Sequence, residues 1–137
     1  MKLYHLVPAT EWRAALAAGQ YRPASLQTEG FVHLSTSVQW LGAANRFYRG
    51  HRDLWLLEVD PDRLRAEIRY EVADGDRFPH LYGPMELEAA TVVCALTPSS
   101  DGTFDAPRVA GGEIDYEALR GVTAHAGPDP RCRSGAS

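Results

Sequence analysis

The chain has 137 residues, 45% of them hydrophobic, and a formal net charge of −4. This length supports one domain with its own hydrophobic core and is too short for two ordinary domains. The negative charge argues against broad binding to nucleic acid or to an anionic membrane, because both need a basic surface. The sequence contains neither the roughly 7–15-residue apolar stretch of a signal peptide nor the ~18 apolar residues of a membrane span, so we expect a cytoplasmic protein.

The apolar and turn-forming residues predict short strands and helices that do not alternate regularly. In the first half we expect a strand over 3–7, a helix capped by Thr10 and closed by Gly19, an irregular stretch over 21–29, a strand over 31–34 and a helix that begins at 35–37 and ends at Gly50. In the second half we expect strands over 54–59, 65–72, 91–96 and 103–105. Because these later strands follow one another without helices between them, the predicted fold class is α+β. We assign residues 1–108 to a single domain and 109–137 to a C-terminal extension, a short helix over 114–119 and then a flexible tail.

Two of the predicted strands differ in their patterns. The segment 54–59 is apolar except for Glu58, which predicts a central strand. Residues 65–72 alternate instead, with Ala66, Ile68, Tyr70 and Val72 on one side, which predicts a strand with one face in water.

Three of the five histidines lie in apolar segments. They are His5 within 3–7, His33 within 30–36 and His80 within 78–83. Burying an imidazole among apolar residues costs free energy unless the ring is hydrogen-bonded, so we expect the three segments to converge on one polar site. The alternative at each position is a core histidine that a neighbouring backbone carbonyl satisfies.

The surroundings of each histidine suggest a different role. His33 and Ser35 share one face of their strand, and Ser35 and Thr36 stand at a helix N-terminus, which favours an anion. The alternative there is that Ser35 only caps the helix. His5 lies between apolar neighbours, which favours a neutral ring. Pro79 and Gly83 predict that His80 and Tyr82 are held on a stiff turn, where they either bind a ligand or fill the edge of the core.

Several short motifs together resemble the bacterial family called domain of unknown function 952. The resemblance covers roughly residues 2 to 107, and the motifs that carry it are 3–5, 21–25, 30–35, Gln39, 44–48, 56–60 and 78–83. That family is grouped as a distant relative with the ADP-ribosyltransferase-like superfamily, whose members bind NAD in a cleft between two small packed sheets. The resemblance implies two small, mostly antiparallel sheets with two main helices.

The resemblance also implies roles for individual residues. In that superfamily a histidine on the first strand contacts the nicotinamide ribose, and His5 resembles that histidine. Tyr82 would stack on the nicotinamide ring. The catalytic glutamate of the third motif has no recognisable counterpart, although Glu86 and Glu88 lie nearby. The predicted catalytic residues are His5, His33 and Tyr82, and the predicted ligand-binding residues are Arg22, Ser35, Thr36, Asn45 and His80.

The implied activity is cleavage of the nicotinamide glycosidic bond or transfer of ADP-ribose, with NAD as substrate, no tightly bound cofactor and no metal. The first alternative is a module that binds a nucleotide or another small ligand without catalysis. The second is a phosphoesterase or an RNA 2'-phosphotransferase-like enzyme. His33-Leu34-Ser35-Thr36 resembles one motif of the two-histidine phosphoesterases, and Arg13, Arg22 and Arg46 are candidates for phosphate contacts. The expected partner is a small-molecule nucleotide, and the sequence does not predict an oligomeric state.

Overall fold

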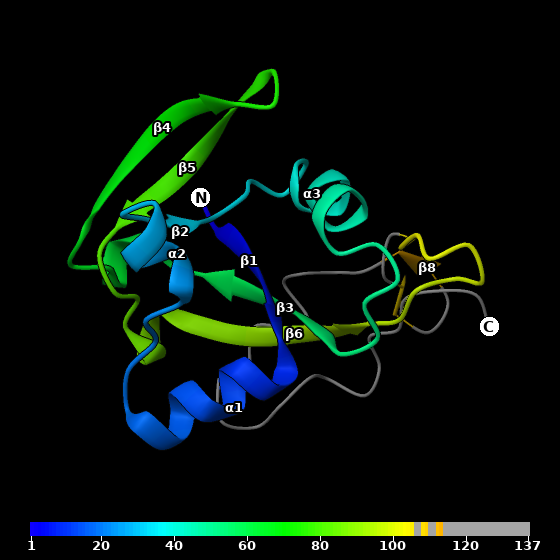
Figure 1. Cartoon of the computed structure of the whole chain (residues 1–137), viewed down its shortest axis with the longest axis horizontal. Helices are drawn as coiled ribbons and strands as arrows, with labels where there is room; N and C mark the ends of the chain where they lie inside the picture. Colours follow the sequence, from blue (N-terminus) through cyan, green and yellow to red (C-terminus); the bar gives the residue numbers. More distant parts are fainter. Residues whose placement is uncertain (106–107, 110–111, 114–137) are drawn as a thin grey trace.

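The computed structural model describes residues 1–105, 108–109 and 112–113, and it has an α+β architecture (Figure 1). One antiparallel sheet has the strand order β1 (Leu3–Pro8), β3 (Leu54–Val59), β6 (Ala90–Leu96). The second has the order β2 (Val32–His33), β5 (Asp76–Tyr82), β4 (Glu67–Ala73). The two main helices are α1 (Ala9–Ala18) and α3 (Trp40–Phe47), and the shorter elements are α2 (Ala24–Thr28), η1 (Pro61–Arg63), η2 (Leu87–Ala89) and the β7 (Arg108–Val109) and β8 (Gly112–Glu113) pair.

This architecture confirms the predicted fold class of two small antiparallel sheets with two main helices. No strand forms over 103–105, so that prediction was wrong. The helix expected over 114–119 and the tail that follows it lie outside the described residues. Within the described ranges, none of the helices is long and apolar enough to cross a membrane.

Strand β3 is the centre of the fold, as its apolar sequence predicts. All six of its residues are buried, and it pairs with β1 on one side and with β6 on the other. One face of β3 packs in a core cluster with Trp12 of α1, and the other packs in a cluster with Trp40 of α3. Its one acid, Glu58, is buried and accepts a hydrogen bond from the Tyr4 hydroxyl at 3.3 Å. Burial on both faces explains the nearly continuous apolar run.

The helices depart from the predicted boundaries. Helix α1 begins directly after Pro8 without a side-chain cap from Thr10, and it ends as predicted at Gly19, whose φ of +79° is left-handed. Helix α2 was not predicted. Helix α3 begins later than 35–37 because Ser35 is held in a β-bridge with Tyr4, with both backbone hydrogen bonds formed.

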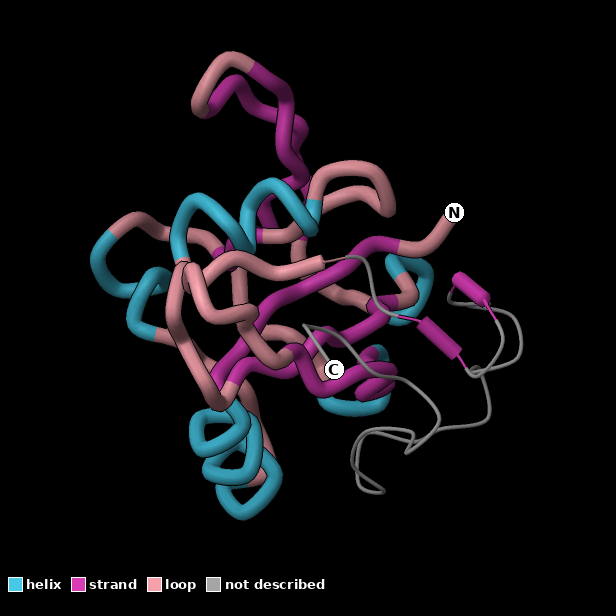
Figure 2. The backbone as a smooth tube through the Cα atoms, turned by 90° about the vertical axis from the view of Figure 1, so that its right-hand side faces the viewer, coloured by secondary structure: helices cyan, strands magenta, loops and turns pink. Residues whose placement is uncertain are grey.

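A long β-hairpin, β4 with β5, replaces the stiff turn that was predicted around His80. Asp74 and Gly75 both have positive φ, as a two-residue type I′ turn requires, and the strands pair from Ala73 with Asp76 to Glu67 with Tyr82. The hairpin extends away from the rest of the molecule (Figures 1 and 2). The predicted inward face of 65–72 is therefore wrong beyond Ile68: Tyr70 is 46% exposed and Val72 is 72% exposed.

Candidate functional site

A cavity of about 480 Å³ lies between the two sheets and is bordered by α2, by α3 and by the hairpin. Its size falls in the range of ordinary small-molecule sites. The three histidine-bearing segments converge here, because His5, His33 and His80 all line it. The other polar or aromatic lining residues are Glu11, Tyr21, Ser25, Glu29, Ser35, Phe47, Tyr48, Asp74 and Phe78.

His5 is buried at the base of the cavity, and both of its ring nitrogens are bonded. Nδ1 lies 2.7 Å from the carbonyl oxygen of His33, and Nε2 lies 2.6 Å from the Tyr21 hydroxyl. A carbonyl oxygen only accepts, so Nδ1–H donates to it and the Nε2 lone pair accepts from the Tyr21 O–H. Burial lowers the pKa of His5 to about 4, and burial also raises the pKa of Tyr21. This confirms the predicted neutral ring.

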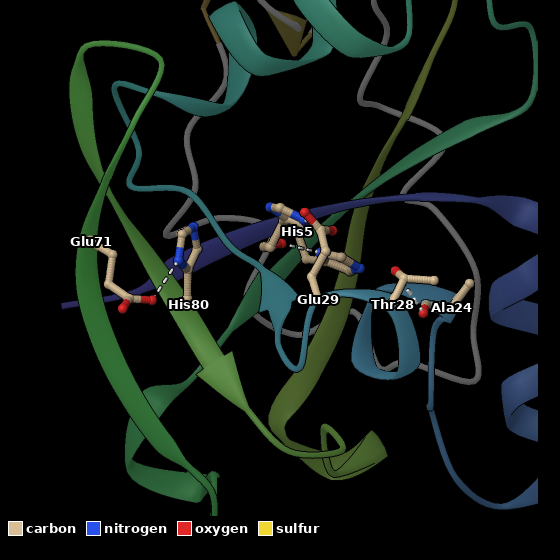
Figure 3. A network of polar contacts seen from close by, with 7 residues as sticks. His5, Ala24, Thr28, Glu29, Glu71 and His80 are labelled. Atoms are coloured by element: carbon tan, nitrogen blue, oxygen red, sulfur yellow. Dashed lines mark hydrogen bonds and ion pairs between the residues drawn. The ribbon is translucent and has the colours of Figure 1, made fainter.

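His80 is held by a carboxylate on the neighbouring strand. Its Nδ1 lies 2.9 Å from Oε1 of Glu71 (Figure 3). The hydroxyl of Tyr82 donates to the same oxygen. The Tyr82 hydroxyl, with His80 second, lowers the pKa of Glu71, and the same contact with Glu71 raises the pKa of Tyr82. The ring of Phe31 stacks on the His80 ring with centroids 3.9 Å apart. Glu71 therefore fixes the orientation of both neighbours.

His33 lies at the mouth of the cavity. Its side chain is 54% exposed, and its Nε2 donates to Oε2 of Glu29 at 2.7 Å. The His33 ring also meets the His80 ring nearly at a right angle, with centroids 5.5 Å apart. An exposed pair of this kind contributes little to stability, so His33 and Glu29 are free to serve a ligand.

The remaining predicted residues are divided between the cavity and the scaffold. Ser35 lines the cavity, whereas Arg22, Thr36, Asn45 and Tyr82 are not among its lining residues. Asn45 joins helix α3 to the backbone of Phe104 through both its amide nitrogen and its oxygen, which is a structural use. The side-chain oxygen of Thr36 is buried without a hydrogen-bond partner, and Arg22 is exposed.

The charge of the cavity is acidic. Glu11, Glu29 and Asp74 border it, and among its lining residues in the described part of the chain there is neither arginine nor lysine. The guanidinium of Arg46 pairs with Asp74 at 3.2 Å, and Arg46 lines an adjoining hollow of about 310 Å³. This charge distribution favours a neutral or cationic ligand group in the cavity and an anionic group farther out.

Sequence reasoning missed three residues of the site, Tyr21, Glu29 and Glu71. The pair Asp74-Gly75 is the signal that would have found Glu71. A two-residue turn there sets Glu71 diagonally beside His80 on one face of the hairpin. Nothing in the sequence marks Glu29. The two acids that sequence reasoning named instead lie elsewhere: Glu86 accepts from the backbone N–H of Arg65 at 2.5 Å, and Glu88 is exposed.

Comparison with known proteins identifies the family of this chain. A family model described as "Protein of unknown function (DUF952)" matches residues 6–93, which is more than half of the chain. The chain belongs to the DUF952 family. The matched segment of this chain includes Tyr21, Glu29, His33, Glu71 and His80, and His5 lies just before it.

Solved structures of a similar protein support the fold. The crystal structure of protein CC0527 from Caulobacter crescentus is 33% identical to this chain, and the match covers 75% of this chain and 92% of that one with a TM-score of 0.69. The solution NMR structure of CC0527 is 34% identical, with 74% and 90% covered and a TM-score of 0.64. No curated protein matches the chain.

Proposed function

We propose that the cavity binds the nicotinamide riboside part of NAD, and that the protein cleaves the nicotinamide–ribose bond or transfers ADP-ribose. The observation that carries this proposal is the convergence of His5, His33 and His80 in one cavity with acidic and aromatic walls. The cavity also lies between two small sheets, which is where the superfamily that DUF952 resembles binds NAD. NAD is then a substrate rather than a tightly held cofactor.

The charge of the cavity suits the nicotinamide end of NAD. The pyridinium ring of NAD is cationic, and the carboxylates of Glu11, Glu29 and Asp74 complement it. The diphosphate would then extend toward Arg46 in the adjoining hollow. A phosphate inside the main cavity would instead meet carboxylates without an arginine or lysine to balance them.

Glu29 is the best candidate for the carboxylate that the reaction needs. As nicotinamide departs, positive charge builds on the ribose, and a carboxylate placed beside it stabilises that charge. Glu29 lines the cavity and its carboxylate is held by His33, whereas Glu86 and Glu88 do not line it. Tyr82 would act at a distance, by holding Glu71, in place of the stacking role that the resemblance implies.

The proposal is tested by binding and by turnover. Millimolar nicotinamide riboside or NAD should raise the melting temperature by mass action, and ligand-observed NMR should detect contact with the nicotinamide protons. Chromatography then measures the release of nicotinamide from NAD. Glu29→Gln should reduce that release about 100-fold or more, and Glu88→Gln is the matched control that should leave it unchanged. Absence of any binding by both compounds would overturn the proposal.

One observation favours binding without catalysis as a second candidate. Both nitrogens of His5 are already bonded within the protein, so the ring offers no atom to a ribose unless Tyr21 or the His33 carbonyl is displaced. This candidate predicts that NAD or ADP-ribose binds and that no nicotinamide is released over long incubation.

The phosphoesterase or 2'-phosphotransferase alternative has less support. Arg13 lies over the ring of Trp55, Arg46 pairs with Asp74, and neither Arg13 nor Arg22 lines either hollow. A larger rise in melting temperature with a 2'-phosphorylated nucleotide than with NAD would favour this alternative.

A further inference from the structure

His80 has one ring nitrogen that the protein leaves without a partner. The residue is 4% exposed and is among those that line the cavity, and its Nε2 is buried with no hydrogen bond. Among the buried side-chain polar atoms of the described residues, only the Thr36 hydroxyl shares this condition, and Thr36 does not line the cavity. An unpaired polar atom in the interior costs free energy, so its retention in the wall of a ligand-sized cavity calls for an explanation.

The ring cannot turn to find another partner. Glu71 binds Nδ1 on one edge, and the ring of Phe31 lies flat over the face, tilted by only 15°. In Figure 3 the second ring nitrogen of His80 lies on the side away from Glu71. The missing partner must therefore come to Nε2 from outside the protein's own side chains.

The chemistry of that partner follows from Glu71. An ionised carboxylate only accepts hydrogen bonds, so the proton of a neutral His80 ring lies on Nδ1 and Nε2 presents a lone pair. Glu71 is kept in place by the Tyr82 hydroxyl, and Arg69 lies over the Tyr82 ring at 4.7 Å. While the ring is neutral, Nε2 is therefore an acceptor, and a hydroxyl is a group that can donate to it.

Because Nε2 is buried, a ligand reaches it only if a neighbouring side chain moves, and the rings next to His80 are those of Phe31 and His33. His33 lies edge-on to the His80 ring, and its own hydrogen bond to Glu29 is exposed to solvent. Exposed pairs of this kind are weak, so His33 can rotate outward at little cost.

We propose that a ribose hydroxyl of the bound ligand donates to Nε2 of His80, and that Glu71 is the positioning residue that makes this nitrogen an acceptor. This inference rests on the proposed function, because that function supplies a ribosylated ligand. It adds a specific recognition contact on β5 and a supporting carboxylate on β4. Neither depends on the identity of the catalytic carboxylate.

The role of Glu71 is tested without any ligand. Long-range ¹H–¹⁵N NMR of the full chain reports which nitrogen of each imidazole carries the proton, and a His80→Gln variant assigns the signals. His80 should be in the Nδ1–H form in the unaltered protein. Glu71→Ala should shift it toward the Nε2–H form, and Glu67→Gln should leave it unchanged, because Glu67 lies on the same strand and pairs with Arg69 instead. A dominant Nε2–H form in the unaltered protein would overturn the inference.

The hydroxyl contact is tested with nicotinamide riboside and its 2'-deoxy and 3'-deoxy analogues. The unaltered protein should bind one deoxy analogue about tenfold more weakly than the parent compound, which is the loss expected for one hydrogen bond. His80→Phe should bind all three with equal affinity, and His80→Gln provides a second variant if the first fails to fold.

The outcomes separate the two proposals. Equal binding of the three compounds by the unaltered protein, or full discrimination retained in both His80 variants, overturns the role of His80 and leaves the proposed function standing. Absence of binding by every compound, with the Nδ1–H form observed, overturns the proposed function and with it the ribose contact.

Discussion

Removing the Tyr21 hydroxyl should measure how much the buried His5 contributes to the fold. In Tyr21→Phe the only atom lost is the oxygen that donates to Nε2 of His5 at 2.6 Å. Both residues are almost fully buried, with His5 6% and Tyr21 4% exposed, so the acceptor is left unpaired. An unpaired buried acceptor costs about 1–3 kcal/mol. Because both side chains line a cavity that admits water, we expect the lower part of that range, about 1–2 kcal/mol.

Urea unfolding followed by fluorescence measures this difference in the free energy of unfolding. For a domain of this size the expected fall in melting temperature is about 4–8 °C. Tyr70→Phe is the matched control, because Tyr70 is 46% exposed on the hairpin and its loss should change stability by less than about 0.5 kcal/mol. Equal effects of the two substitutions would refute the reasoning. A double-mutant cycle with His5→Leu should give a coupling energy of about 1 kcal/mol, since the two side chains are in direct contact.

Three further predictions follow from burial and charge. Burial lowers the pKa of His5 to about 4, so between pH 6.5 and 4 the unfolded chain binds a proton at His5 that the folded protein excludes. The free energy of unfolding should therefore fall by about 3 kcal/mol as the pH drops from about 6.5 to 4. Urea titrations across this range check the fall, and His5→Gln should remove it. His33→Ala should lower the free energy of unfolding by less than about 1 kcal/mol, because the bond of His33 to Glu29 is exposed. The same change should weaken the binding of nicotinamide riboside. A loss of stability as large as that of a core residue would contradict the assignment of His33 to the site. Trp55→Ala should cost about 3–5 kcal/mol in the same unfolding assay through loss of packing on β3, and a loss below about 1 kcal/mol would contradict the central position of that strand.

The sequence predicts the parts of this fold that local patterns determine. The run 54–59 is apolar because β3 is buried on both faces, and the prediction of its bounds is confirmed. The positive φ of Gly19 likewise ends α1 where the sequence places its end. These features depend on burial and on backbone geometry within a few residues.

The errors arise where distant segments decide the structure. Ser35 has the side chain of a helix cap, but its backbone pairs with Tyr4 far away in the sequence, so the helix starts later. Tyr70 and Val72 alternate like core residues, but the hairpin carries them beyond the core.

Only part of the candidate site could be predicted, because its residues also come from segments far apart in the sequence. An imidazole in an apolar segment is visible in the sequence, and the structure brings His5, His33 and His80 to one cavity. Their partners come from Tyr21, Glu29 and Glu71, which no local pattern links to them. Polar partners on separate elements become apparent only once the sheets are placed side by side.

The hairpin that forms one wall of the cavity is anchored unevenly. Near its root, β5 pairs with β2 through Leu81 and His80. Near its tip, exposed polar contacts tie it to the start of α3 and to its last turn: Gln39 donates to Asp76 and to the Arg77 carbonyl, and Arg46 pairs with Asp74. Exposed contacts of this kind are weak, and salt also screens the ion pair between Arg46 and Asp74. The width of the cavity therefore depends on a hairpin whose root is held by strand pairing and whose tip is held only by weak surface contacts. Rising ionic strength should relax that end before any other part of the wall and so broaden the range of ligand sizes that the cavity accepts.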